Sequence, residues 1–133
     1  MAVTSLNTHA YSINTQGGYQ KLNFDFDEKT EVYDSCSVQW YNHFYIFGGN
    51  NYNRQVSRVN GNRLERKGDL SFNFYSGGCT VLNQQTVVLC FGTYNVAEDV
   101  CRQSNNPIGP FTKLNKSNFA HHETRIASFD GNI

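Results

Sequence analysis

Histidine and glycine residues are the first places to look for chemistry in this chain. His121, His122 and Glu123 are adjacent, and neighbouring residues on a strand point to opposite faces, so both histidines cannot readily bind one metal ion. Gly48 and Gly49 end an apolar run, but a phosphate-binding loop needs a following helix and further glycines, and the strand-like sequence RQVSRV comes soon after. We therefore predict a surface position for the histidines and a tight strand end at the glycines.

The four cysteines, Cys36, Cys79, Cys90 and Cys101, form no C-x-x-C pair, which disfavours a zinc site. We predict that they are buried thiols that behave as small apolar residues. The alternative is a disulfide between Cys90 and Cys101, because these two residues end runs that could pair as a hairpin. The chain also lacks G-x-S-x-G and H-E-x-x-H motifs and a cysteine with a clear histidine partner, so we predict no catalytic residue, cofactor or metal ion.

Aromatic and basic side chains offer the chemistry of binding instead. Trp40, Tyr41, His43, Phe44 and Tyr45 surround a predicted turn; alternate residues would serve the core, and the others could stack on a sugar or a peptide. Five cations follow on a predicted hairpin, at Arg54, Arg58, Arg63, Arg66 and Lys67. They suit a solvated outer hairpin or an acidic partner, and the acidic segment 25–34 could be their complement. The predicted binding surface consists of Trp40, Tyr41, His43, Tyr45, Arg54 and Arg58.

Composition sets the class of fold. The 133 residues contain 11 basic and 11 acidic side chains, so the net charge of +0 gives no reason to expect a nucleic acid or an anionic membrane as partner. No apolar run approaches the ~20 residues that a membrane-spanning helix needs. Aromatic residues make up 14%, with 11 Gly and only 2 Pro, which is typical of short strands and tight turns. We predict an all-β protein.

The compartment is less clearly marked. The first ten residues lack the basic end and apolar core of a signal peptide, although a signal cleaved from a precursor stays open. Four cysteines, the glycosylation motif Asn115-Lys116-Ser117 and abundant Asn and Tyr favour a secreted protein, whereas buried thiols and the missing signal fit the cytoplasm.

A repeat of about 44 residues organises the chain. Residues 35–49 align with residues 77–92 so that Cys36 meets Cys79 and Gly49 meets Gly92, both at a spacing of 43 and without a gap. A third copy of the first half occupies residues 123–133, and Phe-rich segments recur at 21–26, 69–74 and 115–120. A period of this size is typical of propellers and other repeat arrays.

Each copy is predicted to form four short strands. The middle copy has strands at 35–40, 44–49, 55–59 and 63–67, with Asn60-Gly61 as a hairpin turn, and the next copy at 78–83, 87–92, 99–104 and 111–114. The remaining copy combines a strand at 123–129 and the turn Asp130-Gly131 with strands at 2–7, 10–14 and 19–22. The chain is thus expected to be a single domain, 1–133, of three blades: 123–133 plus 1–22, 35–67 and 78–114.

A four-stranded repeat whose second strand ends in Phe-Gly-Gly resembles a kelch repeat. The matching residues are Phe47, Gly48 and Gly49, with Phe91 and Gly92 as a degenerate copy; Tyr52 and Tyr94 could take the place of the kelch Tyr, and no Trp follows the glycine pair. The resemblance implies a β-propeller with four-stranded antiparallel blades, three in this chain. Because propellers close with about 4–8 blades, we expect a six-bladed homodimer or a longer parent protein that supplies the other blades.

The resemblance implies a non-enzymatic binding or scaffold module whose rim loops hold a protein or glycan partner. A self-assembling structural half-propeller without a small-molecule ligand is the second interpretation. A metal-dependent enzyme is the third, because kelch-like folds include a copper oxidase.

Overall fold

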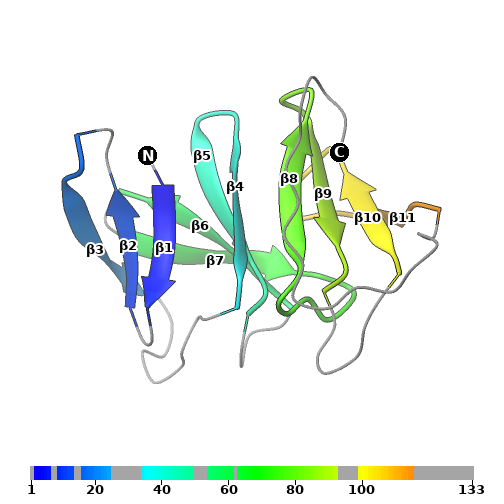
Figure 1. The fold of residues 1–133 in the computed structure, drawn as a ribbon, viewed down its shortest axis with the longest axis horizontal. Helices are drawn as coiled ribbons and strands as arrows, with labels where there is room; N and C mark the ends of the chain where they lie inside the picture. The colour runs from blue at the N-terminus through cyan, green and yellow to red at the C-terminus, as the bar shows by residue number, and fades with distance from the viewer. Residues whose placement is uncertain are drawn as a thin grey trace.

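The computed structural model describes residues 2–6, 9–13, 16–24, 34–49, 54–61, 63–92 and 99–115, and all regular structure in these ranges is β-strand (Figure 1). The strands are β1 (Ala2–Leu6), β2 (His9–Ile13), β3 (Tyr19–Phe24), β4 (Cys36–Trp40), β5 (His43–Phe47), β6 (Gln55–Asn60), β7 (Arg63–Asp69), β8 (Gly78–Leu82), β9 (Thr86–Cys90), β10 (Cys101–Ser104) and β11 (Thr112–Lys113). The predicted strand at 123–129 and the turn Asp130-Gly131 lie outside the described residues.

The eleven strands coincide with the predicted strands to within about two residues at each end. The all-β prediction is therefore confirmed. The turn between β6 and β7 starts one residue later than predicted. Asn60 still pairs with Arg63, so Gly61, with φ 59°, is the first turn residue.

The strands form antiparallel meanders in chain order. β4–β7 and β8–β11 are each four-stranded and antiparallel, and β1–β3 form a three-stranded meander. A short parallel pairing of β3 with β7, at Asn23↔Arg63 and Phe24↔Leu64, joins β1–β3 and β4–β7 into one seven-stranded sheet. The first meander is thus not separate from the second, because β3 satisfies backbone groups at the outer edge of β7 that would otherwise be unpaired.

The repeat is visible in the backbone conformation. Left-handed residues recur as Asp34 and Ser76 (φ 58° and 54°), Tyr41 and Asn83 (51° and 50°), and Gly48 and Phe91 (59° and 61°). The first two pairs are separated by 42 residues and the third by 43, because the β8–β9 turn holds one extra residue, Gln84, also left-handed at 60°. The two four-stranded sheets are therefore built on one backbone plan.

The extra turn residue shifts the register of β8 by one position. Cys36 pairs with Phe47, but the residue that pairs with Cys90, the equivalent of Phe47, is Gly78. The gapless alignment of Cys36 with Cys79 is therefore wrong by one residue in this strand. A shift of one residue turns every side chain of a strand to the opposite face, so Cys79 points the opposite way from Cys36 within its own sheet.

This shift brings two cysteines together. A disulfide joins Cys36 on β4 to Cys79 on β8, with their Cα atoms 5.9 Å apart, and a second disulfide joins the directly paired Cys90 and Cys101 on β9 and β10. The prediction of buried thiols is wrong, and the alternative for Cys90 and Cys101 is confirmed. The first pair was missed because its spacing of 43 was interpreted only as a repeat.

The two sheets pack front to back. On β5 the core between the sheets takes Tyr45 and Phe47, whereas on β9 it takes Val87 and Leu89. The equivalents of Tyr45 and Phe47 on β9 are Val88 and Cys90, which are buried on the other face. One sheet thus packs its face against the opposite face of the next, and the two first strands, β4 and β8, lie side by side (Figure 1).

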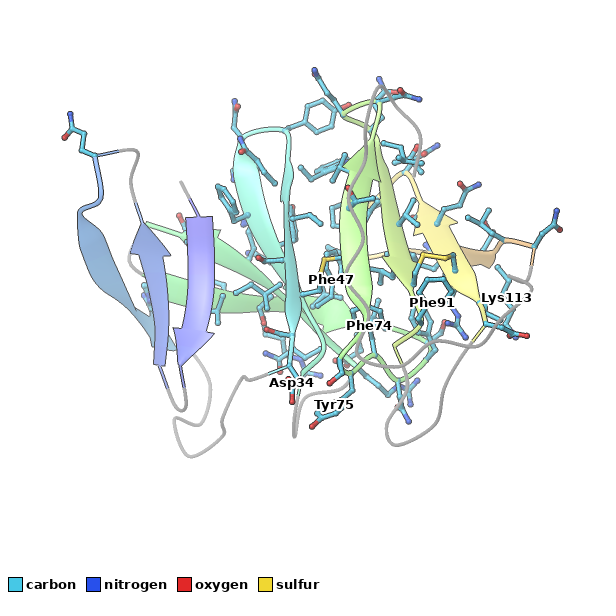
Figure 2. All side chains as sticks on the ribbon, in the orientation of Figure 1. Asp34, Phe47, Phe74, Tyr75, Phe91 and Lys113 are labelled. Atoms are coloured by element: carbon cyan, nitrogen blue, oxygen red, sulfur yellow. A yellow bond between two sulfur atoms is a disulfide. The ribbon has the colours of Figure 1, made fainter. Side chains whose placement is uncertain are left out.

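The segment between β7 and β8 fills the space between the two sheets. Leu70 and Phe74 are 2% and 0% exposed, and Figure 2 shows Phe74 beside Phe47, in the core. Phe111, which directly precedes β11, packs edge to face on both Phe47 and Phe72, with ring centroids 6.3 and 5.8 Å apart. The guanidinium of Arg102 lies 4.3 Å from the centroid of Phe72. This aromatic cluster therefore packs the segment between β7 and β8, here called the linker, against both sheets.

Glycines make the room that Phe74 occupies. A Cβ atom on Gly92 would lie 2.3 Å from the Phe74 ring, and one on Gly77 would lie 2.6 Å from it. At Gly48 the conflict would be with the backbone, since a Cβ there would lie 1.9 Å from the carbonyl oxygen of Phe74, while the N–H of Gly49 donates to that oxygen at 3.1 Å. The Gly-Gly sequence therefore receives the linker, and its N–H groups are not arranged around an anion.

Removing the disulfide between the sheets should destabilise the protein more than removing the one within a sheet. Replacing Cys36 and Cys79 by Ser should lower the free energy of unfolding by about 4 kcal/mol, and replacing Cys90 and Cys101 by about 3 kcal/mol, because the loops closed are 43 and 11 residues long. Urea denaturation followed by the fluorescence of the single Trp measures both. Peptide mapping without reductant that recovers free thiols would contradict the pairing.

Filling the Phe74 site from the glycine side should be costly. Gly92→Ala should lower the free energy of unfolding by about 1–3 kcal/mol, because the new methyl group overlaps a fully buried ring. In a Phe74→Leu background the same substitution should cost less, which a double-mutant cycle detects as a coupling energy. Additive effects of the two substitutions would show that Gly92 and Phe74 do not constrain each other.

Candidate binding surface at the turn end of the sheets

The β4–β5 and β8–β9 turns lie at the same end of the molecule, at the top of Figure 1. Antiparallel register places Trp40 opposite His43 at this end, with the two-residue turn Tyr41-Asn42 between them. One row further in, Val38, Tyr45, Arg58 and Glu65 are paired in sequence across the four strands, so their side chains share the face that meets the second sheet. Hence five of the six predicted binding residues gather at one end of one sheet.

Trp40 connects the two turns. Its indole N–H donates to the carbonyl oxygen of Gln85, in the β8–β9 turn, at 2.9 Å. Its ring meets Tyr41 and Tyr45 edge to face, with centroids 4.5 and 6.2 Å apart. Tyr45 is buried, while Tyr41 is 54% exposed, so the cluster has a structural inner part and an accessible outer residue.

Glu65 forms ion pairs with two basic side chains of the hairpin formed by β6 and β7. Its carboxylate accepts hydrogen bonds from Asn60 and Lys67, both at 2.7 Å, and lies 3.5 Å from the guanidinium of Arg58. The pKa of Glu65 is lowered from 4.5 to about 2. The largest cause is the hydrogen bond from Lys67, followed by the hydrogen bond from Asn60, because both favour the ionised carboxylate. This ion cluster fixes one edge of the predicted surface, and Nε of Arg58 is buried within the described residues without a hydrogen bond.

Arg54 does not belong to this surface. It precedes β6, at the other end of the sheet, and its Nε donates to the carbonyl oxygen of Leu70 at 3.0 Å. The N–H of Leu70 in turn donates to the Arg54 carbonyl oxygen. Arg54 therefore fastens the linker to the sheet, and strand alternation could not have shown this, because the partner lies 16 residues away.

Most of the other predicted cations also have partners in the same hairpin. Arg66 pairs with Asp69, and Arg58 and Lys67 pair with Glu65. The local carboxylates, rather than the acidic segment 25–34, are thus the complement that the structure describes; apart from Asp34, that segment lies outside the described residues. This arrangement fits the solvated outer hairpin better than it fits an acidic partner.

Two residues of the surface were missed by sequence reasoning. Glu65 could have been found, because the predicted Asn-Gly hairpin places it opposite Arg58. Gln85 could not, since its contact with Trp40 depends on how two sheets pack, 45 residues apart in sequence.

Metal chemistry gains no candidate in the described ranges, where no three His, Cys, Asp or Glu side chains gather closely enough to hold an ion. His121, His122 and Glu123 lie outside those ranges. Among the residues that the structure describes, no helix is long and apolar enough to span a membrane.

Comparisons with protein families and with curated proteins found no match. No protein-family model matches this sequence, and none of the curated proteins is significantly similar to it. The functional argument therefore rests on the residues themselves.

The pH dependence of stability should report the Glu65 cluster. Because the folded pKa of Glu65 is about 2 and its ordinary value 4.5, its ionised form stabilises the protein above about pH 5, and this stabilisation is lost as the pH falls toward 2. Glu65→Gln should therefore lower the urea midpoint at pH 6 and have much less effect near pH 2.

Asp69→Asn is the control for this experiment. It breaks an ion pair whose two side chains are 56% and 49% exposed, so its effect should be small at every pH. A constant difference between wild type and Glu65→Gln from pH 2 to pH 7 would contradict the role given to Glu65.

Proposed function

We propose that this chain is a non-enzymatic binding or scaffold module built from kelch-like propeller blades, with the turns at one rim presented to a protein or glycan partner. The observation that carries the proposal is the gathering of exposed aromatic and polar side chains on two neighbouring turns of a rigid frame. Trp40 joins those turns through Gln85, and a disulfide joins the strands Cys36–Trp40 and Gly78–Leu82 beneath them. Surface loops held by a rigid scaffold are where binding residues concentrate.

The propeller part of the proposal is supported by how the sheets stack. Blades of a propeller are four-stranded meanders that repeat around an axis, so the front of one blade meets the back of the next. Front-to-back packing, a shared backbone plan and the close approach of the two first strands all agree with that arrangement. A sandwich of two sheets related by a two-fold axis would instead bury the same face of both.

The proposal counts β1–β3 as part of a third blade, although in the structure they continue the sheet of β4–β7 through the β3–β7 pairing. Three blades would leave a ring open. We propose that two copies of the chain close a six-bladed ring, with residues 123–133 and 1–22 contributing to one blade; the alternative is a longer parent that supplies the other blades. A purely structural, self-assembling role is the second candidate function. It is favoured by β1 and β11, two of the four edge strands of the described sheets, because an edge strand can pair with another chain.

We also propose an oxidising compartment for this protein. Two disulfides account for all four cysteines, and such bonds persist outside the cytosol. This agrees with the glycosylation motif at Asn115, although that motif alone is weak support.

The mass in solution tests the closure. Light scattering on a sizing column at several concentrations should give a species of about 30 kDa, twice the 15.1 kDa chain, because a closed ring leaves no exposed blade face. A monomer of 15.1 kDa at all concentrations would contradict the homodimer.

Binding itself is tested by glycan arrays of neutral and charged glycans and by affinity capture of proteins from extracellular fluid. The probe is wild type, and the control is a variant with both turns replaced by Asn-Gly sequences. A partner that binds wild type and not the variant supports the module. If neither glycans nor proteins distinguish the two, the structural role replaces the binding function.

A further inference from the structure

The rim formed by the two turns has an unusual chemical character. Besides the exposed Tyr41, five exposed amide side chains occupy the two turns and the adjoining end of β4: Gln39, Asn42, Asn83, Gln84 and Gln85. We call this set, with Tyr41, the amide rim. Residues 39–43 and 83–86 contain no Asp, Glu, Lys or Arg, in a chain with 22 such residues. The cluster of charged side chains around Glu65 lies instead one row of paired residues further from the turn.

Tyr41 occupies a backbone position that its side chain makes unfavourable. Its φ is 51°, in the left-handed region that Gly and Asn tolerate and bulky residues avoid. The equivalent residue of the next sheet, at φ 50°, is Asn83. The two copies thus place different residues at the same left-handed position. In the first copy this residue is the large aromatic Tyr41, which costs stability.

Packing explains Tyr41 only in part. Phe91 is also left-handed, but it is half-buried, so its ring can be retained for contacts with the fold. Tyr41 is 54% exposed, and its ring contact is with Trp40, whose indole is already fixed by Gln85. A strained, exposed aromatic residue on a buttressed turn is the kind of outlier that indicates function.

We infer that the amide rim binds a neutral glycan, with Tyr41 as the residue on which a sugar ring stacks. This rests on the proposed binding function and names its ligand class. Sugar hydroxyl groups both donate and accept hydrogen bonds, as Asn and Gln side chains do, while the C–H face of a pyranose buries apolar area against an aromatic ring. A sulfated or uronic-acid glycan would need cations, which the rim does not contain.

The two turns act together in this site. The hydrogen bond from Trp40 to Gln85 fixes their separation, and Gln39 donates from its side chain to the carbonyl oxygen of Tyr41 at 3.2 Å, which steadies the turn. Nearby, Thr86 donates to the side-chain oxygen of Asn105 at 2.8 Å, so the rim is bordered by a further polar pair. A preorganised surface loses less conformational entropy when a flexible ligand binds.

The test is titration of the disulfide-bonded protein with neutral hexasaccharides (cellohexaose, chitohexaose, mannohexaose and maltohexaose), followed by heteronuclear NMR. At least one should bind and shift the amide signals of the two turns. Its affinity should change little between about 0.05 and 0.5 M salt, because no ion pair is involved.

Variants of Tyr41 separate stacking from folding. Tyr41→Asn should weaken binding about tenfold and raise Tm by roughly 3–5 °C, since it removes the ring and relieves the turn. Tyr41→Phe should keep the affinity, and Lys113→Ala, an exposed change on β11, should alter neither property.

Three results would overturn the inference: no neutral hexasaccharide binds at millimolar concentration, Tyr41→Asn binds as wild type does, or only a sulfated hexasaccharide binds and salt abolishes it. None of these removes the proposed binding function, which fails only when the capture and array experiments find no partner that depends on the turns.

Discussion

The rest of this structure depends on the close approach of the strands β4 and β8, and that approach depends on one aromatic side chain. Phe74 crosses between the sheets with no exposed surface, and three glycines, Gly48, Gly77 and Gly92, leave it room. Interiors are packed closely enough that a single methyl group at these glycines would displace the ring or the chain. The Phe-Gly-Gly sequence therefore has a mechanical role: it sets the distance between two sheets.

That distance has consequences at both ends of the strands. At one end, the N–H of Ser76 reaches the carbonyl oxygen of Asp34 at 2.9 Å, just before the two first strands begin. Figure 2 shows Asp34 and Tyr75 at this lower end. At the other end Trp40 reaches Gln85, and the two turns become one surface. The Cys36–Cys79 disulfide lies near the lower of these contacts, so the spacing is fixed by packing, hydrogen bonds and a covalent bond together.

Much of the fold could be predicted from the sequence, because its signals are local. Alternating apolar residues and Gly- or Asn-containing turns located the described strands, and the spacing of 43 located the repeat. The part that could not be predicted follows from one residue. Gln84 lengthens the β8–β9 turn by one residue and shifts the register of β8. The aligned cysteines before the turn and the aligned glycines after it are nevertheless both 43 residues apart. The sequence alignment therefore shows neither the shift nor the Cys36–Cys79 disulfide that depends on it. The pairing of β3 with β7 was equally hidden, since it joins two outer edges that have no sequence pattern in common. For the candidate site, the sequence predicted residues around the β4–β5 turn but not Gln85, for the same reason: contacts between sheets have no local signal.

An internal repeat offers a comparison that a single sequence otherwise lacks. Where both copies share a conformation, as at Asp34 and Ser76, the backbone plan requires it whatever the side chain. Where the copies share a conformation but one carries the residue less suited to it, the side chain has been kept for another reason. Phe91 in place of Gly48 is accounted for by burial. Tyr41 in place of Asn83 is not, because more than half of it faces solvent. Local disagreement with the fold thus favours the β4–β5 turn, rather than the Gly-Gly sequence or the cation-rich hairpin, as the place where a binding function is proposed.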